Sequence, residues 1–147
     1  MEEKVEEIKQ EIMEYYDEIE EFFEKLEDYG IQEDVECLDF EINLDTEGDL
    51  ALTVFSTDGY DEVFKNKDNT ENEFAGSEVI IKGIDLKHYS LDDMSDDDYT
   101  DFCDILFEFL KNILEEYMTK IDIPICLKYH DSTLKYNLLS EQWEETF

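Results

Sequence analysis

The chain has 147 residues, with 44 aspartates and glutamates against 11 lysines and no arginine, which gives a formal net charge of −33 at pH 7. A surface this negative repels phosphate backbones and anionic lipids, so we expect direct binding of neither nucleic acid nor a membrane. The hydrophobic content of 41%, with ten phenylalanines and nine tyrosines, is enough to build a core. The composition therefore predicts a single folded acidic domain over residues 1–147, whose natural partner is a basic protein surface.

Residues 1–29 are predicted to form one long amphipathic helix. Apolar residues recur there in a strict three-four spacing, and Gly30 follows where a left-handed C-cap is expected. This apolar stripe, called the helix seam below, consists of Val5, Ile8, Ile12, Tyr15, Ile19, Phe22, Leu26 and Tyr29. Because coiled coils use the same spacing, the seam leaves room for a homodimer. The segment also holds thirteen acids and only three lysines, so its outer face is strongly negative.

Three strands are predicted after this helix. Residues 38–44 and 50–55 alternate apolar with polar side chains and are joined by a turn over residues 45–49, which is typical of a hairpin with one solvated face. A polar loop is predicted over residues 65–73, and residues 78–86, rich in isoleucine, form the third strand.

A second helix is predicted from Ser95 to about Lys120, because the serine hydroxyl can cap it and three aspartates follow at the positive end of its dipole. The last predicted element is a hairpin over residues 125–138. Residues 123–139 hold a single acid and two lysines, so this hairpin alone is not negative. The order α-β-β-β-α-β-β predicts an α+β fold with both helices packed on an antiparallel sheet.

Motifs for catalysis or metal binding are missing. Cys37, Cys103 and Cys126 contain no C-x-x-C pair, so we expect small buried hydrophobes rather than disulfides or zinc ligands. His88 and His130 have no nucleophile motif beside them. The best alignment to a calcium loop puts Val54 where a bidentate glutamate is required. We therefore expect no enzyme activity, no cofactor and no metal.

A row of carboxylates at helical spacing is similar to a phosphate backbone in its line charge. In charge, size and lack of catalytic motifs, the chain resembles the acidic DNA-mimic inhibitors that phages direct against restriction enzymes and CRISPR effectors. This resemblance implies an inhibitor that occupies the basic nucleic-acid channel of a bacterial defence enzyme. The predicted partner-binding residues lie on the outer face of the first helix and in an aspartate cluster: Glu3, Glu7, Glu14, Asp17, Glu21, Asp92, Asp93, Asp96, Asp97, Asp98 and Asp101.

Two other functions fit the same sequence. One is an immunity protein whose acidic face plugs the basic active site of a toxin nuclease. The other is a secretion chaperone, since the order of elements resembles that of the small acidic type III secretion chaperones, although the chain is far more charged and lacks a clear final helix. The chain begins Met1-Glu2-Glu3-Lys4, without the basic and apolar start of a signal peptide, so the expected location is the cytoplasm of a bacterial host.

Overall fold

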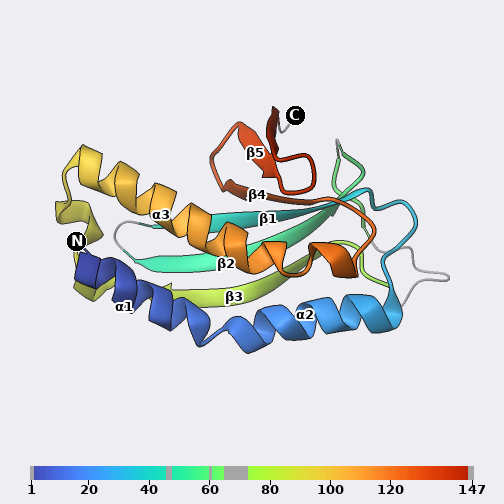
Figure 1. Ribbon diagram of the computed structural model, residues 1–147, viewed down its shortest axis with the longest axis horizontal. Helices are drawn as coiled ribbons and strands as arrows, with labels where there is room; N and C mark the ends of the chain where they lie inside the picture. The colour runs from blue at the N-terminus through green and yellow to red at the C-terminus, as the bar shows by residue number, and fades with distance from the viewer. Residues whose placement is uncertain (1, 46–47, 60, 65–72, 146–147) are drawn as a thin grey trace.

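The computed structural model describes residues 2–45, 48–59, 61–64 and 73–145. Within these ranges, three α-helices cover one face of a six-stranded sheet, which confirms the predicted α+β class (Figure 1). The elements are α1 (Glu2–Met13), α2 (Tyr16–Tyr29), β1 (Cys37–Leu44), β2 (Asp49–Thr57), β3 (Ser77–Asp85), the short 3₁₀ helices η1 (Lys87–Tyr89) and η2 (Leu91–Asp93), α3 (Asp96–Glu115), η3 (Met118–Lys120), β4 (Ile125–Tyr129), β5 (Leu134–Asn137) and β6 (Gln142–Glu145). The turn residues 46–47 and most of the predicted polar loop, residues 65–72, lie outside the described residues.

The prediction of one continuous N-terminal helix is wrong at residues 14–15. A tight turn, in which the amide of Tyr15 donates to the carbonyl of Ile12 over 2.9 Å, separates α1 from α2. Buried seam residues lie on both sides of this turn, so the seam faces the core along both helices. Gly30 ends α2 with a positive φ of 84°, but its ψ of −177° is extended rather than left-handed helical.

The sheet is mixed rather than antiparallel, which corrects the predicted topology. Its strand order is β3-β2-β1-β4-β5-β6, and β1 pairs with β4 in parallel, Phe40 lying opposite Leu127. The other neighbours are antiparallel. The predicted C-terminal hairpin is present as β4 and β5, and β6 extends it at the edge. The parallel junction arises because α3 crosses the sheet between β3 and β4 and returns the chain beside the first strand.

Most of the helix seam is buried in the chain's own core, with Tyr15 half-buried and Tyr29 exposed. Val5, Ile8, Ile12, Ile19, Phe22 and Leu26 are each at most 7% exposed. Around them, the ring of Phe23 lies 5.9 Å from that of Phe40 in β1 and 4.3 Å from that of Tyr117 after α3. These six seam residues therefore pack against the sheet and α3, whereas Tyr29 at the end of the seam is 55% exposed. The homodimer through the seam stays a prediction.

The face of the sheet away from the helices carries the polar half of the strand pattern. Leu38, Phe40 and Ile42 are fully buried beneath the helices, whereas Asp39 and Glu41 between them point to the other face and keep some exposure. Two lysines of the C-terminal hairpin reach these acids: Lys135 lies 3.0 Å from Asp39, and Lys128 lies 3.8 Å from Glu41. The two lysines that make this hairpin less negative thus form ion pairs with acids of β1.

Candidate functional site

The outer faces of α1 and α2 form one acidic stripe. Since the seam points inward, the residues opposite it point to solvent. All five predicted positions are exposed: Glu3 and Glu7 in α1, Glu14 in the turn between the helices, and Asp17 and Glu21 in α2. The two helices run end to end along one side of the sheet (Figure 1). The acidic stripe therefore continues across the break between α1 and α2.

The N-terminus of α3 carries the predicted aspartate cluster. The Ser95 hydroxyl accepts a hydrogen bond of 3.2 Å from the amide of Asp98, which confirms Ser95 as the N-cap. The capped turn presents three successive aspartates at the positive end of the helix dipole, where negative charge is stabilised. All six predicted residues are exposed in η2 and the first turns of α3: Asp92, Asp93, Asp96, Asp97, Asp98 and Asp101.

Tertiary packing brings the stripe and the aspartate cluster together at one end of the molecule. The N-terminal ends of α1 and α3 lie beside η1 and η2 there (Figure 1). The Tyr89 hydroxyl in η1 donates a hydrogen bond of 2.9 Å to the Glu11 carboxylate in α1. Burial of Tyr89 and this hydrogen bond raise its pKa to about 12, so the tyrosine stays neutral as a donor at physiological pH. The eleven predicted residues, called the acidic surface below, therefore form a stripe with a dense cluster at one end.

Lysines leave the acidic surface unneutralised. Among the described residues, the ion pairs of lysine involve other acids, such as Glu6 with Lys9, Glu78 with Lys25, and Glu108 and Glu115 with Lys111. Lys128 and Lys135 are held on the far face of the sheet. None of the eleven residues of the acidic surface takes part in an ion pair with a lysine in the described ranges.

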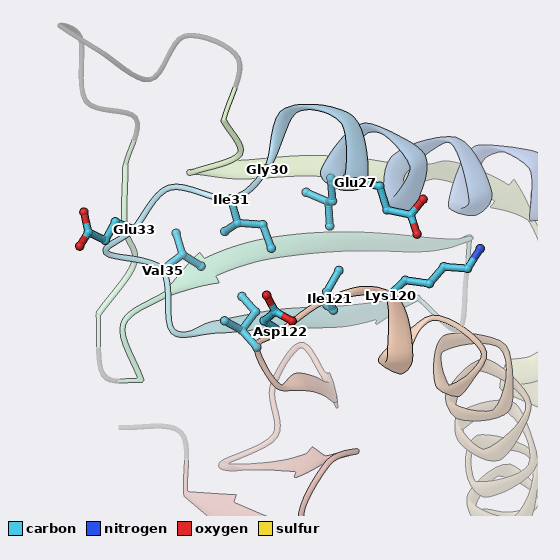
Figure 2. Close-up of a pocket in the computed structure, with 10 residues that line it drawn as sticks. Glu27, Gly30, Ile31, Glu33, Val35, Lys120, Ile121 and Asp122 are labelled. Atoms are coloured by element: carbon cyan, nitrogen blue, oxygen red, sulfur yellow. The ribbon is translucent and has the colours of Figure 1, made fainter.

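A pocket of about 460 Å³ lies at the other end of the stripe, where α2 ends (Figure 2). Its apolar lining comes from the end of α2, the segment before β1 and the segment before β4, and consists of Leu26, Ile31, Val35, Ile121 and Ile123. Glu27, Glu33 and Asp122 add carboxylates to the lining, against one lysine, Lys120. A cavity lined by both apolar side chains and carboxylates suits a side chain with an aliphatic stem and a cationic end, such as lysine or arginine.

The surroundings of the two histidines differ from those of a typical catalytic histidine. His130, at the β4–β5 turn, is exposed and places its Nδ1 3.2 Å from the Glu41 carboxylate. His88 is exposed in η1, with its ring centroid 4.0 Å from that of Tyr89. In the part of the chain that the structure describes, neither histidine has a hydrogen bond to a serine or cysteine side chain. The expectation of no enzyme activity stays a prediction.

Sequence reasoning missed one cluster. Cys37 in β1 and Cys126 in β4 are 89 positions apart, yet their sulfur atoms lie 3.2 Å apart, and Cys37 is also 3.2 Å from Asp39 Oδ1. The hydrogen bond to Cys126 and burial raise the pKa of the Cys37 thiol, so it is protonated at neutral pH and is not a nucleophile. The period-two pattern places Cys37 and Asp39 on one strand face, but only the parallel pairing of β1 with β4 adds Cys126.

No protein-family model, curated protein or solved structure matches the chain. Within the described residues, no helix combines the length and the apolar character needed to cross a membrane.

Proposed function

We propose that the protein inhibits a nucleic-acid-handling enzyme by occupying its basic nucleic-acid channel with the acidic surface. The observation that carries the proposal is the exposed, unneutralised stripe along α1 and α2, which continues into the aspartate cluster of η2 and α3. Residues 2–29 hold thirteen acids and three lysines over about 42 Å of helix, which is one net negative charge per about 4 Å. One strand of DNA carries one phosphate per about 3.4 Å of axis. A groove that attracts DNA would thus meet a comparable field.

The mechanism follows from electrostatics and shape. Opposite potentials steer the two proteins together and make association fast and sensitive to salt, whereas shape and a few apolar contacts decide which channel is filled. The pocket at the end of α2 supplies such a contact, because its apolar lining and acidic edge suit a basic side chain of the partner. The fold supports this role, since α1 and α2 bury their apolar faces in the core and turn their acidic faces to solvent.

An immunity protein against a toxin nuclease would bind through the same acidic surface. The target is therefore either a bacterial defence enzyme or a toxin nuclease. The secretion chaperone has less support. Such chaperones act as dimers with apolar grooves, and the most regular apolar surface of this chain, the helix seam, is used in its own core. The gene next to the one that encodes this chain would separate the first two functions, a toxin gene in one case and phage genes in the other.

The test is affinity capture from a bacterial lysate with two matched triple variants. The first replaces Glu7, Glu14 and Asp17 of the acidic surface with lysine. The second replaces three exposed acids elsewhere with lysine: Asp34, Asp131 and Glu145. Three replacements of two charge units each bring both variants from −33 to −27, so they share a net charge and differ only in where it changes.

We expect the wild type and the second variant to capture a nucleic-acid-binding enzyme that duplex DNA displaces, and the first variant to lose it. Capture should weaken steeply between 50 mM and 200 mM salt, the range over which contacts made through charge lose most of their strength. The proposal fails if the captured protein is indifferent to duplex DNA or to salt. It also fails if both variants behave alike, because net charge rather than the acidic surface would then explain the binding.

A further inference from the structure

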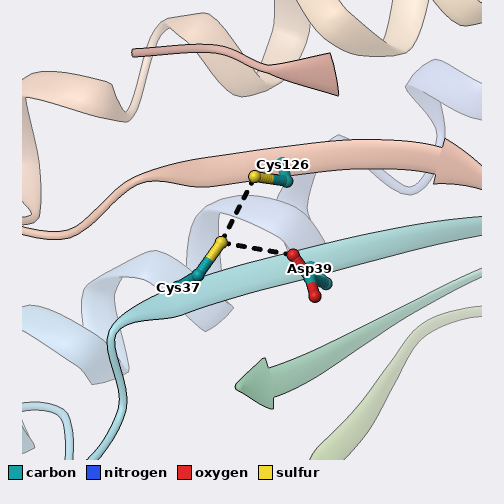
Figure 3. A group of neighbouring side chains, drawn as sticks. All are labelled: Cys37, Asp39 and Cys126. Atoms are coloured by element: carbon teal, nitrogen blue, oxygen red, sulfur yellow. Dashed lines mark hydrogen bonds between the residues drawn. The ribbon is translucent and has the colours of Figure 1, made fainter. Parts of the chain in front are cut away.

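The side of the sheet away from the helices holds three potential metal ligands that the proposed function does not use. Cys37, Asp39 and Cys126 come from the adjacent strands β1 and β4, and their sulfur and oxygen ligand atoms all lie within 4.8 Å of one another. Figure 3 shows the two sulfur atoms directed at each other, with the Asp39 carboxylate beside them. Cys37 and Cys126 are 6% and 1% exposed, so these atoms are shielded from bulk solvent.

The strand register disfavours a disulfide between these cysteines. Asp39 lies opposite Cys126, so Cys37 is two residues out of register with it. Two residues along a strand and one strand spacing across it put the two Cα atoms roughly 8 Å apart, and disulfides need Cα atoms closer than about 7 Å. The sulfur atoms thus point at each other from strands that are too far apart to be bridged directly. A metal ion bound between the two sulfur atoms can link the strands at this separation.

We propose that Cys37, Cys126 and Asp39 bind one thiophilic divalent cation of the Zn²⁺ class, with a fourth position open to water. Zinc holds thiolates at about 2.3 Å and carboxylate oxygens at about 2.0–2.2 Å in a tetrahedron. Two sulfurs bound this way lie about 3.8 Å apart, so the observed 3.2 Å has to widen only slightly. Small rotations of the two side chains are enough.

The charges around the site also balance. In the metal-free protein the cluster holds two free cysteines and the ion pair of Asp39 with Lys135. Binding of the cation releases one proton from each thiol, and the two thiolates formed compensate its two positive charges. No net charge is added to this shielded place, which limits the electrostatic cost of binding. Lys135 also contacts the second oxygen of Asp39 at 3.2 Å, so it can orient the carboxylate while Oδ1 turns to the metal.

The thiolate ligands give this site a different metal preference from that of the acidic surface. Carboxylates alone favour Mg²⁺ and Ca²⁺, whereas two thiolates favour Zn²⁺ and similar soft ions. A bound ion would join β1 to β4, the parallel junction between the two halves of the chain, and would stabilise the folded state because the unfolded chain cannot offer the same ligand set.

The test is a titration of the reduced, full-length protein with Co²⁺, in excess Mg²⁺ to occupy surface carboxylates. We expect a thiolate-to-cobalt absorption band that saturates at one Co²⁺ per chain. Cys103 in α3 provides the matched control, since it lies outside the cluster. Cys103→Ser should keep the band, and Cys37→Ser and Cys126→Ser should lose it. Zn²⁺ should displace Co²⁺ and raise the melting temperature of the wild type and of Cys103→Ser.

A second measurement needs no variant and so does not depend on how well the serine variants fold. The ¹¹³Cd resonance of the wild-type protein loaded with one Cd²⁺ should fall in the range typical of two sulfur ligands. Absence of the cobalt band, its survival in Cys37→Ser, its loss in Cys103→Ser, or a cadmium shift typical of oxygen ligands alone would each overturn the proposal. None of these results bears on capture by the acidic surface, because that test changes residues on other elements.

Discussion

Replacing Lys135 with alanine tests whether the far face of the sheet is stabilised by a buried ion pair. The Lys135 ammonium lies 3.0 and 3.2 Å from the two oxygens of Asp39, and the two side chains are only 7% and 16% exposed. Lys135→Ala leaves the Asp39 carboxylate largely shielded from water, with the Cys37 thiol as its remaining neighbour. Removal of one partner from a buried pair typically costs 3–5 kcal/mol.

The residual exposure of Asp39 lets water solvate part of the charge, so we expect the lower end of this range, about 3 kcal/mol of unfolding free energy. For a domain of this size the loss corresponds to a melting temperature lower by roughly 6–12 °C. The control is Lys25→Ala. The pair of Lys25 with Glu78 spans 3.9 Å with side chains that are 54% and 39% exposed, and such pairs contribute at most about 1 kcal/mol.

Urea unfolding followed by far-ultraviolet circular dichroism measures both variants on the same scale. A double variant, Asp39→Asn with Lys135→Met, should recover much of the loss because it leaves no unpaired charge. If Lys135→Ala costs no more than Lys25→Ala, the pair contributes little and the reasoning is wrong.

The same pair predicts a dependence on pH. Burial alone would lower the pKa of Lys135, but Asp39 and its other neighbours raise it overall. A lysine whose pKa is higher in the folded state stabilises the fold fully below its unfolded value of about 10.4. This stability is lost as the pH rises through the higher folded value. Alkaline unfolding of the wild type should therefore be steeper than that of Lys135→Met.

Three further predictions concern the acidic surface and its surroundings. Ser95→Ala should cost about 1 kcal/mol in urea unfolding, because the Asp98 amide loses its cap, and an equal cost for exposed Ser140→Ala would contradict this. Sodium chloride should raise the melting temperature while it weakens partner capture, since the net charge of −33 repels itself in the folded chain; a flat thermal response would refute the first part. Tyr89, whose pKa is raised to about 12, should ionise late in a tyrosinate absorbance titration, and its contribution to stability should be lost between about pH 10 and 12. Because the pKa values of Tyr16, Tyr99 and Tyr129 are raised as well, Tyr89→Phe should reduce the amplitude of the late step by one tyrosine rather than abolish it.

Local patterns predicted much of the fold because they depend on neighbouring residues. The three-four spacing identified the helical N-terminal segment and its buried seam, and Ser95 with its aspartates marked the start of α3. The break at residues 14–15 was missed, since no proline or glycine stands there to mark it. β6 was missed because its four residues are all exposed and carry no clear alternation.

By itself, the sequence determined the sign and density of the surface charge, the α+β class and which face of each amphipathic element is buried, because periodicity fixes the inner and outer sides of helices and strands. Only the tertiary structure decided what meets across elements. The parallel register of β1 and β4 brings Cys37 and Cys126 together. The pairing of β5 with β4 brings Lys135 within ion-pair distance of Asp39. The packing of α1 beside η1 and α3 joins the acidic stripe to the aspartate cluster. Contacts between residues this far apart in the chain depend on strand order and helix placement, which no local pattern encodes.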